Sequence, residues 1–393
     1  MEGAFIVNAT RSAQRRRIAE LDGLRAVAVM GVIYGHIWAF GCKSTPMRIG
    51  PVDVNRLLSI FGTGVDLFFV ISGFCMYLMY AGRIDAFRWS TYGSFLSGRA
   101  QRILPAYLVA ILFAGFVRMA EQGAFPWRNV IANALFVQLF VPDALALNDV
   151  FWSLATEWHF YMVLPALIAI GDRVGYPLTL FAAILLSILY RAVFSEPYRG
   201  EPIPLDLQLP SRLGEFCLGI AVARSFAAGR LPPPWFRGAH GFVAAFAVMC
   251  VGRVLLTEQV TQISETAGVV ARAFNIPILA CGYALIVWNV VSCESVFARL
   301  LRTFPLQWLG KISYSMYLWH WFPSLWIAGW LMRLFDGAAF VPIVATLVAT
   351  AVLWPVATLS YRLFEAPYFS RRARGGAPAT NESASTGNVR SST

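Results

Sequence analysis

Residues 21–40 read LDGLRAVAVMGVIYGHIWAF, an apolar stretch that holds one arginine, Arg25, and one histidine, His36. A helix needs about 20 apolar residues to cross roughly 30 Å of hydrocarbon, so this stretch is long enough to span a membrane. It has no small-residue cleavage site and more apolar runs follow it, which argues against a cleaved signal peptide. The stretch therefore predicts a first transmembrane helix that carries two ionisable side chains.

Further apolar runs of similar length recur along the chain. We predict spans at residues 24–42, 57–80, 103–120, 151–170, 177–194, 208–227, 238–257, 272–290, 312–333 and 340–362. Residues 129–141, bounded by Pro126 and Pro142, are too short to cross and predict a re-entrant or interfacial segment. The expected fold class is an all-α polytopic membrane protein with ten transmembrane helices and this one short segment.

The composition supports a membrane protein. Of 393 residues, 58% are hydrophobic and 13% are charged, whereas a soluble domain carries about 25% charged residues. This excludes a cytosolic enzyme, a disordered scaffold and a secreted disulfide-rich module. The net charge of +11 comes from arginines in short gaps between apolar runs, without a basic stripe interleaved with aromatic residues. A nucleic-acid partner is therefore not expected.

The distribution of Lys and Arg predicts the orientation. Ten spans place both termini on one side, and most of the 32 Lys and Arg residues fall on that side, which is therefore cytoplasmic. We divide the chain into a basic cytoplasmic segment at 1–17, a membrane domain at 18–370 and a disordered cytoplasmic tail at 371–393. The six cysteines are isolated, mostly in apolar surroundings, so we expect neither a disulfide nor a metal site.

Ionisable residues at membrane depth are candidate functional residues, because they are costly to place there. Arg25 and His36 are eleven residues apart, so they share one helix face and are separated by a rise of about 16 Å. The alternative interpretation is an interfacial arginine and a core histidine bonded to a neighbouring helix. The second span holds Asp66 in GTGVDLFFVISGF, a carboxylate that either orients an imidazole or pairs with a buried arginine.

Two arginines, Arg99 and Arg102 in SGRAQRILPAY, share a face where the third span begins. They are either a paired grip on phosphates, to which the arginine fork is suited, or ordinary cytoplasmic-side arginines. Later spans contribute further polar residues of the same kind. These are Glu157 and His159 in FWSLATEWHFYMVLP, Arg212 and Glu215 in SRLGEFCLGI, His320 in KISYSMYLWHWF and Glu365 in YRLFEAPY.

Seven of these motifs occur together and in a fixed order over residues 18–369. They are LDGLRA with the following His36, GVDLFFVISGF, SGRAQRILP, WSLATEWHFY, SRLGEFCLG, SYSMYLWH and FEAP. In this set the chain resembles the acyltransferase family 3 membrane proteins, bacterial enzymes that O-acylate surface polysaccharides, glucans, Nod factors and macrolides. The resemblance implies a ten-helix fold, an acyl-CoA donor, a catalytic histidine at His36, an essential Arg25, and a donor side at Arg99 and Arg102. Some members add an SGNH hydrolase-like domain, which we do not expect here.

The expected chemistry agrees with the resemblance. Acyl transfer from a thioester needs a base for the acceptor hydroxyl and a donor group for the developing oxyanion. His36 serves as that base or as the nucleophile of an acyl relay. Asp66 or Glu157 would hold its tautomer, and His320 is the alternative catalytic histidine.

The predicted function is transfer of an acyl group, acetyl or succinyl, from acyl-CoA to a hydroxyl of a cell-envelope or exported saccharide. The enzyme would lie in the bacterial cytoplasmic (inner) membrane and would use no metal. The main alternative is a polytopic transporter or flippase for a saccharide or a lipid-linked intermediate. An acyltransferase consumes acyl-CoA supplied from inside, whereas a transporter has no need of it.

Reporter fusions test the predicted orientation. A reporter that works only in the cytoplasm should be active after Gly229 and after Thr393, and silent near Glu201, because these sites follow an even or an odd number of predicted spans. Activity near Glu201 would overturn the orientation and, with it, the side from which the donor arrives.

Overall fold

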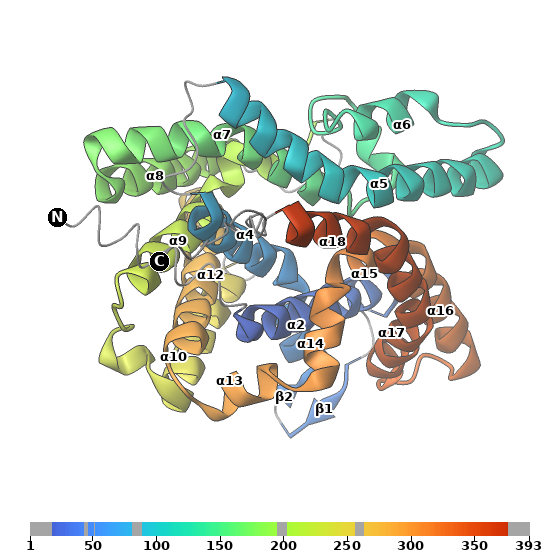
Figure 1. Cartoon of the computed structure of the whole chain (residues 1–393). Coiled ribbons are helices and arrows are strands. Elements are labelled where there is room, and N and C mark those ends of the chain that lie inside the picture. Colours follow the sequence, from blue (N-terminus) through green and yellow to red (C-terminus); the bar gives the residue numbers. More distant parts are fainter. Residues whose placement is uncertain are drawn as a thin grey trace, which may run out of the picture.

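The computed structural model describes residues 18–42, 46–50, 52–80, 89–194, 203–255 and 263–375. The predicted N-terminal segment 1–17, the tail beyond 375 and the fusion site at Glu201 lie outside the described residues. Within them the chain is almost entirely helical (Figure 1). The expected all-α polytopic class is thus confirmed, apart from a two-stranded antiparallel hairpin that pairs Arg48 with Asp53.

Among the described residues, seven helices are long and apolar enough to cross a membrane. They cover Ala19–Gly41, Val54–Tyr80, Ser90–Gln122, Trp152–Val174, Tyr176–Phe194, Glu265–Ser292 and Val341–Ser370. The remaining three predicted spans are helical too, but they are shorter or carry more charge. They form α9 (Leu209–Ala227), α10 (Gly238–Val254) and the pair α15 (Ser313–Trp319) and α16 (Trp321–Leu334). The number of ten spans, and the side on which the termini lie, stay predictions.

The other elements are the following. They are α2 (Ala19–His36), η1 (Ile37–Gly41), β1 (Arg48–Ile49), β2 (Val52–Asp53), α3 (Val54–Leu58), η2 (Ser59–Thr63), α4 (Gly64–Tyr80), α5 (Trp89–Gln122), α6 (Trp127–Ala134), η3 (Ala144–Leu147), α7 (Trp152–Val174), α8 (Tyr176–Phe194), η4 (Leu205–Leu207), η5 (Pro234–Phe236), α12 (Glu265–Ser292), α13 (Val296–Leu301), α14 (Phe304–Lys311), α17 (Val341–Ser360), η6 (Tyr361–Glu365) and α18 (Ala366–Gly375).

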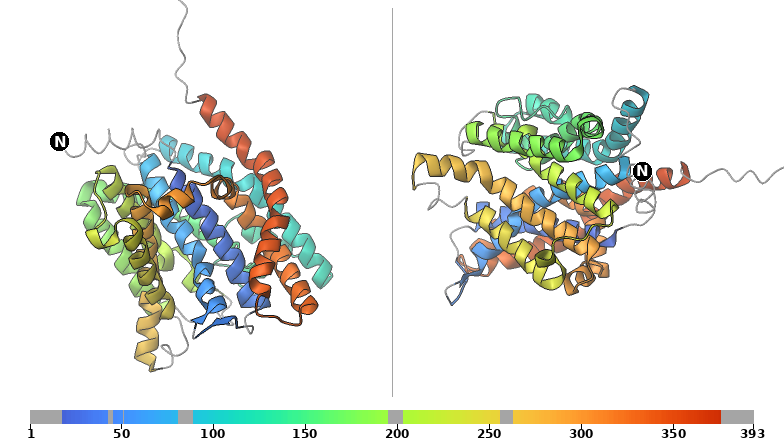
Figure 2. Two further views of the ribbon diagram at one scale, coloured as in Figure 1. Left: turned by 90° about the horizontal axis from the view of Figure 1, so that it is seen from below. Right: turned by 90° about the vertical axis from the view of Figure 1, so that its left-hand side faces the viewer.

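The first helix lies at the centre of the molecule. In Figure 1, α2 and α4 occupy the middle, with α7 and α8 above them, α10 and α12 to the left and α16 and α17 to the right. The left view of Figure 2 shows these helices running side by side as a bundle. α2 contacts α4, α14, α15, α16 and α17, so its side chains face protein on most sides. Arg25 and His36 therefore point into the bundle rather than into lipid.

Glycines bring the second span close to its neighbour. A Cβ added to Gly73 on α4 would collide with the backbone of Phe216 on α9, and one added to Gly219 would collide with the backbone of Val70. Small residues at these positions allow the two helix backbones to touch, as is usual where helices associate in lipid. The close approach places the charged residues of α9 directly beside Asp66.

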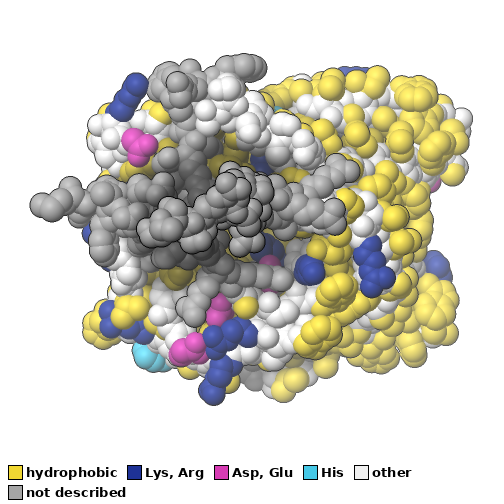
Figure 3. Space-filling view, in the orientation of Figure 1, with side chains coloured by type: hydrophobic (Ala, Val, Ile, Leu, Met, Phe, Trp, Pro, Cys, Tyr) yellow, Lys and Arg dark blue, Asp and Glu magenta, His cyan; other side chains and the backbone are white. Residues whose placement is uncertain are grey.

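The surface is apolar where lipid is expected. Large exposed hydrophobic side chains lie along α5, α8 and α17. Figure 3 shows apolar side chains covering the side of the molecule formed by α5, α16 and α17. In the predicted short segment, only α6 is helical and turns follow it, consistent with a segment too short to span.

Helix α18 extends into the stretch that the sequence assigns to the tail. α18 continues through residues 371–375 to Gly375, because the Arg-Arg-Ala-Arg stretch there favours a helix and glycines follow only at its end.

Candidate active site

A cavity of about 640 Å³ lies between α2, α4, α7, α15 and η6. One end is lined by Ile18, Met79 and Lys311, close to the start of α2, and we call it the Ala19 end. The other end, lined by Val65, Ser153 and Tyr317, is the inner end. The polar residues that line the cavity are Asp22, Arg25, Ser72, Cys75, Arg102, Ser153, Glu157, Tyr161, Lys311, Ser313, Tyr314, Tyr317, Tyr361 and Glu365. Four of the predicted site residues, Arg25, Arg102, Glu157 and Glu365, thus face one space.

Arg25 lies in the wall of the cavity and is already paired. Its NH1 donates to the Asp22 carboxylate at 2.8 Å, and its NH2 lies 3.2 Å from the sulfur of Cys75. Asp22 therefore compensates its charge, while Cys75 connects it to α4. Since Arg25 and His36 are about 16 Å apart along the helix, Arg25 cannot reach an oxyanion that forms beside His36.

Arg99 and Arg102 do not form a pair at the cavity, contrary to the predicted grip. Arg99 is 1% exposed and donates to the hydroxyls of Tyr80, at 3.0 Å, and Tyr368, at 2.9 Å. It connects α5 to α4 and α18. Arg102 instead lines the cavity, with its guanidinium over the ring of Phe369. The three-residue spacing places the two arginines near one another, but Tyr80 and Tyr368 bind only Arg99.

Neither carboxylate that was expected to orient His36 contacts it. Oε1 of Glu157 accepts hydrogen bonds from Ser72 at 2.7 Å and from Tyr161 at 2.6 Å, inside the cavity. Glu365 likewise accepts a hydrogen bond from Ser315 at 2.7 Å. Hydroxyl groups thus hold both carboxylates, from neighbouring helices in the case of Ser72 and Ser315 and from the same helix in the case of Tyr161. Carboxylates inside a helix bundle need such partners.

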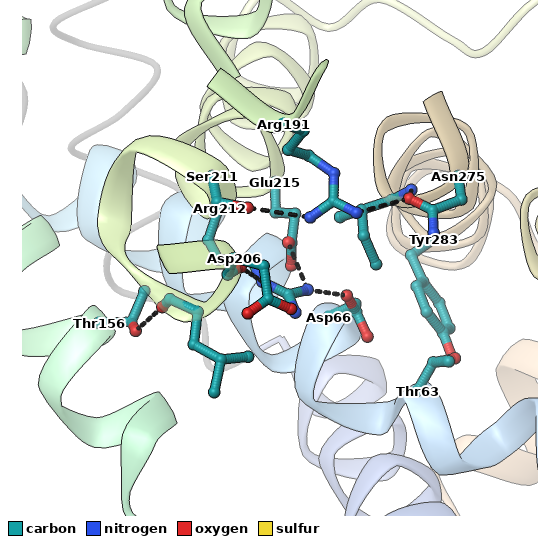
Figure 4. A network of polar contacts seen from close by, with 12 residues as sticks. Thr63, Asp66, Thr156, Arg191, Asp206, Ser211, Arg212, Glu215, Asn275 and Tyr283 are labelled. Atoms are coloured by element: carbon teal, nitrogen blue, oxygen red, sulfur yellow. Dashed lines mark hydrogen bonds and ion pairs between the residues drawn. The ribbon is translucent and has the colours of Figure 1, made fainter. Parts of the chain in front are cut away.

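Asp66 belongs to a separate buried network (Figure 4). Arg212 donates to Asp66 at 3.0 Å and to Glu215 at 3.3 Å. Arg191 lies beside them and donates to Ser211 at 2.9 Å and Asn275 at 2.7 Å. Of the two interpretations of Asp66, the structure supports the pair with a buried arginine. Arg191 was not among the predicted residues, although an arginine inside the apolar run 177–194 is a visible signal of a buried polar contact.

His36 is paired instead with His320. Nδ1 of His36 lies 3.0 Å from Nε2 of His320, and Nδ1 of His320 lies 2.7 Å from the backbone carbonyl oxygen of Tyr317. His320 is fully buried, and Trp321 packs edge-on against the His36 ring with ring centres 5.1 Å apart. Here α15 ends and α16 begins, and α2 passes into the wide turn of η1 directly after His36, a local irregularity that is frequent at functional sites.

The hydrogen bonds determine the tautomers of the neutral pair. A carbonyl oxygen can only accept, so Nδ1 of His320 carries a proton and donates to Tyr317. Nε2 of His320 is then bare and accepts from Nδ1–H of His36. The remaining nitrogen of His36, Nε2, is consequently left with a free lone pair. Nε2 of His36 is thus available as a base or a nucleophile, and His320 orients the ring in place of a carboxylate.

Tyr317 joins the cavity to the histidine pair. Its hydroxyl donates to the carbonyl oxygen of Val150 at 2.7 Å and lies 2.7 Å from the hydroxyl of Ser153. Its ring lines the inner end of the cavity and packs against the ring of His320, with centres 5.4 Å apart. His159 lies elsewhere, with Nε2 at 2.9 Å from the carbonyl oxygen of Phe136, and is not part of this site.

Removal of Asp66 should destabilise the protein. Asp66→Ala leaves the buried Arg212 with Glu215 and the backbone carbonyl of Asp206 as acceptors, and we expect a loss of about 3 kcal/mol, the lower end of the range for a broken buried ion pair. Asp66→Asn keeps an acceptor for Arg212 and should lose less. The measurement is the free energy of unfolding in detergent.

The control is Glu294→Ala. Arg302 donates hydrogen bonds to this exposed carboxylate and thereby holds its pKa below the ordinary value. Exposed pairs of this kind contribute little, so unfolding should be nearly unchanged. Equal losses for Asp66→Ala and Glu294→Ala would contradict a structural role for the buried network.

Known proteins of one family resemble this chain. A family model described as an acyltransferase domain matches residues 18–362. The chain is 28% identical to "Putative peptidoglycan O-acetyltransferase YrhL" of Bacillus subtilis, over 92% of this chain and 57% of the relative. It is 29% identical to the exopolysaccharide production protein ExoZ of Rhizobium meliloti, over 80% of this chain and 92% of the relative. The chain thus spans little more than half of YrhL. No solved structure matches it.

Proposed function

The chain belongs to the acyltransferase family whose model matches residues 18–362, and we propose that it is a membrane O-acyltransferase with His36 as its base. The donor would be acyl-CoA, and the acceptor a hydroxyl of a cell-envelope or exported saccharide. The observation that carries this proposal is the pair of His36 and His320, whose orientation is set by the hydrogen bond from His320 to the carbonyl oxygen of Tyr317. Tyr317 also lines the cavity, which contains cationic side chains. The family match does not favour the transporter alternative.

The free nitrogen of His36 suits the chemistry. In the proposed reaction, Nε2 of His36 takes the proton of the acceptor hydroxyl while the oxygen attacks the thioester carbonyl. The tetrahedral intermediate then collapses, the carbon–sulfur bond breaks, and the thiolate of CoA takes up the proton from His36. The acceptor leaves as its ester. In the relay version, Nε2 attacks the thioester, the carbon–sulfur bond breaks and CoA leaves as its thiolate. The acceptor oxygen then takes the acyl group from His36 and its proton passes to the thiolate, so an acyl-His36 accumulates when no acceptor is supplied.

His320 acts as a positioning residue. It touches His36 rather than substrate, and its Nε2 accepts from Nδ1–H of His36 both before and after His36 takes up a proton. The interaction therefore holds the ring in one orientation and stabilises the imidazolium that forms. A neutral acceptor suits a membrane interior, where an unpaired carboxylate would be costly.

The donor would occupy the cavity, with its polar end at the Ala19 end and its thioester toward Tyr317. The bias of Lys and Arg predicts that the Ala19 end faces the cytoplasm, where acyl-CoA is made. The relatives that are named O-acetyltransferases support acetyl as the acyl group. The names of YrhL and ExoZ refer to peptidoglycan and exopolysaccharide, which supports a saccharide acceptor.

Mass spectrometry of cell-envelope glycans tests the proposed function. A strain that expresses the chain should carry acyl esters that a deletion strain lacks, and sealed vesicles should form them only when acyl-CoA is on the cytoplasmic side. Identical glycans in the two strains, or use of acyl-CoA from the other side, would contradict the proposal.

Substitution of the two histidines should have graded effects. His36→Gln cannot take the proton, so kcat should fall by about 10²–10⁴-fold, the usual contribution of general acid–base catalysis. His320→Gln retains an amide oxygen that can accept from His36, and it should keep more activity than His320→Leu. In both His320 variants kcat should change and KM for acyl-CoA should not. The measurement is steady-state turnover with purified protein.

His159→Gln is the matched control, because His159 is hydrogen-bonded to a carbonyl away from the site. It should leave kcat close to the wild-type value. Near-normal turnover of His36→Gln, together with an inactive His320→Gln, would move the role of base from His36 to His320.

A further inference from the structure

Two cations at the Ala19 end of the cavity have no side-chain hydrogen bond or ion pair with any residue that the structure describes. One is Arg102, whose guanidinium lies 5.6 Å from the ring centre of Phe369. The other is Lys311, whose ammonium lies 5.3 Å from the ring centre of Trp308 and 5.4 Å from that of Tyr361. Both side chains line the cavity. Aromatic rings hold the two charges in place but do not neutralise them.

Neighbouring arginines differ in this respect. Arg25 pairs with Asp22, and Arg99 donates to the hydroxyls of Tyr80 and Tyr368. These arginines are committed to the fold. The hydrogen-bond donors of Arg102 and Lys311 remain available, so they can bind an anion that enters the cavity.

We propose that Lys311, together with Arg102, binds the phosphates at the nucleotide end of the acyl-CoA donor. This inference rests on the proposed function and deepens it. An arginine fork can hold one phosphate through two hydrogen bonds, while the lysine ammonium adds a compact point charge. Glu365 also lines the cavity and offsets part of the charge of Arg102, so a multiply charged ligand needs the second cation.

The position of Lys311 relative to the histidines supports this assignment. Lys311 ends α14, one residue before α15 begins, and His320 directly follows α15. The seven residues of α15 correspond to a rise of about 10 Å, so this helix spans most of the distance from the cation to the histidine pair. Tyr314 and Tyr317 on α15 line the cavity between them, opposite Phe68 on α4. The flexible pantetheine arm of CoA is the part that would occupy this largely apolar section, with the thioester ahead of it.

Donors that lack the nucleotide test the inference. With the full-length protein in detergent, KM is measured for acetyl-CoA, for acetyl-dephospho-CoA and for acetyl-pantetheine. We expect Lys311→Ala to raise KM for acetyl-CoA about tenfold, the loss of one charge-assisted hydrogen bond, and to leave KM for acetyl-pantetheine unchanged. Lys311→Arg should stay close to wild type. Arg362→Ala, an exposed cation next to Tyr361, is the matched control and should change neither KM.

Direct binding separates this inference from the proposed function. Calorimetric titration with CoA and with pantetheine should show that CoA binds more tightly and that Lys311→Ala removes the difference. If this result is found without turnover of any thioester, the proposed function fails and the phosphate site stands. If Lys311→Ala changes the affinity for CoA and for pantetheine equally, or changes neither, the inference is overturned. It is also overturned if Lys311 affects only stabilisation by anionic lipid vesicles, since the phosphate would then belong to a headgroup.

Discussion

The backbone carbonyl of Tyr317 can only accept a hydrogen bond, and the chemistry of the site depends on this constraint. It assigns the proton of His320 to Nδ1, which in turn makes His36 a donor at Nδ1 and leaves Nε2 of His36 free. Serine hydrolases orient their histidine with a carboxylate. Here a peptide group and a second histidine do the same without introducing a charge. In a low-dielectric bundle this avoids the cost of an unpaired carboxylate.

The same environment separates structural from functional polar groups. Inside a membrane protein, a polar side chain needs a partner from the protein itself, because lipid offers none. Asp66, Arg99, Arg191 and Arg212 have such partners and connect helices far apart in sequence. The cavity-facing Arg102 and Lys311 are not paired with any described residue, and the free nitrogen of His36 follows from its tautomer. The groups that keep donors or a lone pair available are those that the proposed reaction would use.

The helical elements and the class of protein could be predicted from the sequence because hydrophobic run length and helical period depend on neighbouring residues. The pairing of His36 with His320 could not, since it joins residues 284 positions apart and depends on how α2 and α15 pack. The three-residue spacing of Arg99 and Arg102 likewise predicted that they share a helix face. It could not predict that Tyr368 binds Arg99 and leaves Arg102 facing the cavity. The sequence does not single out Lys311 either, because its position in the cavity depends on the contact of α14 with α2.

The position of the proton on the neutral His36 ring decides whether Nε2 can act as a base. Nitrogen-15 NMR of the full-length protein in lipid, with labelled histidine and a His36→Gln variant for assignment, measures this directly. We expect His36 to be neutral with its proton on Nδ1 and its Nε2 bare, and His320 likewise to carry its proton on Nδ1. A His36 protonated at Nε2 and bare at Nδ1 would contradict the account, because the nitrogen assigned as the base would have no lone pair to offer.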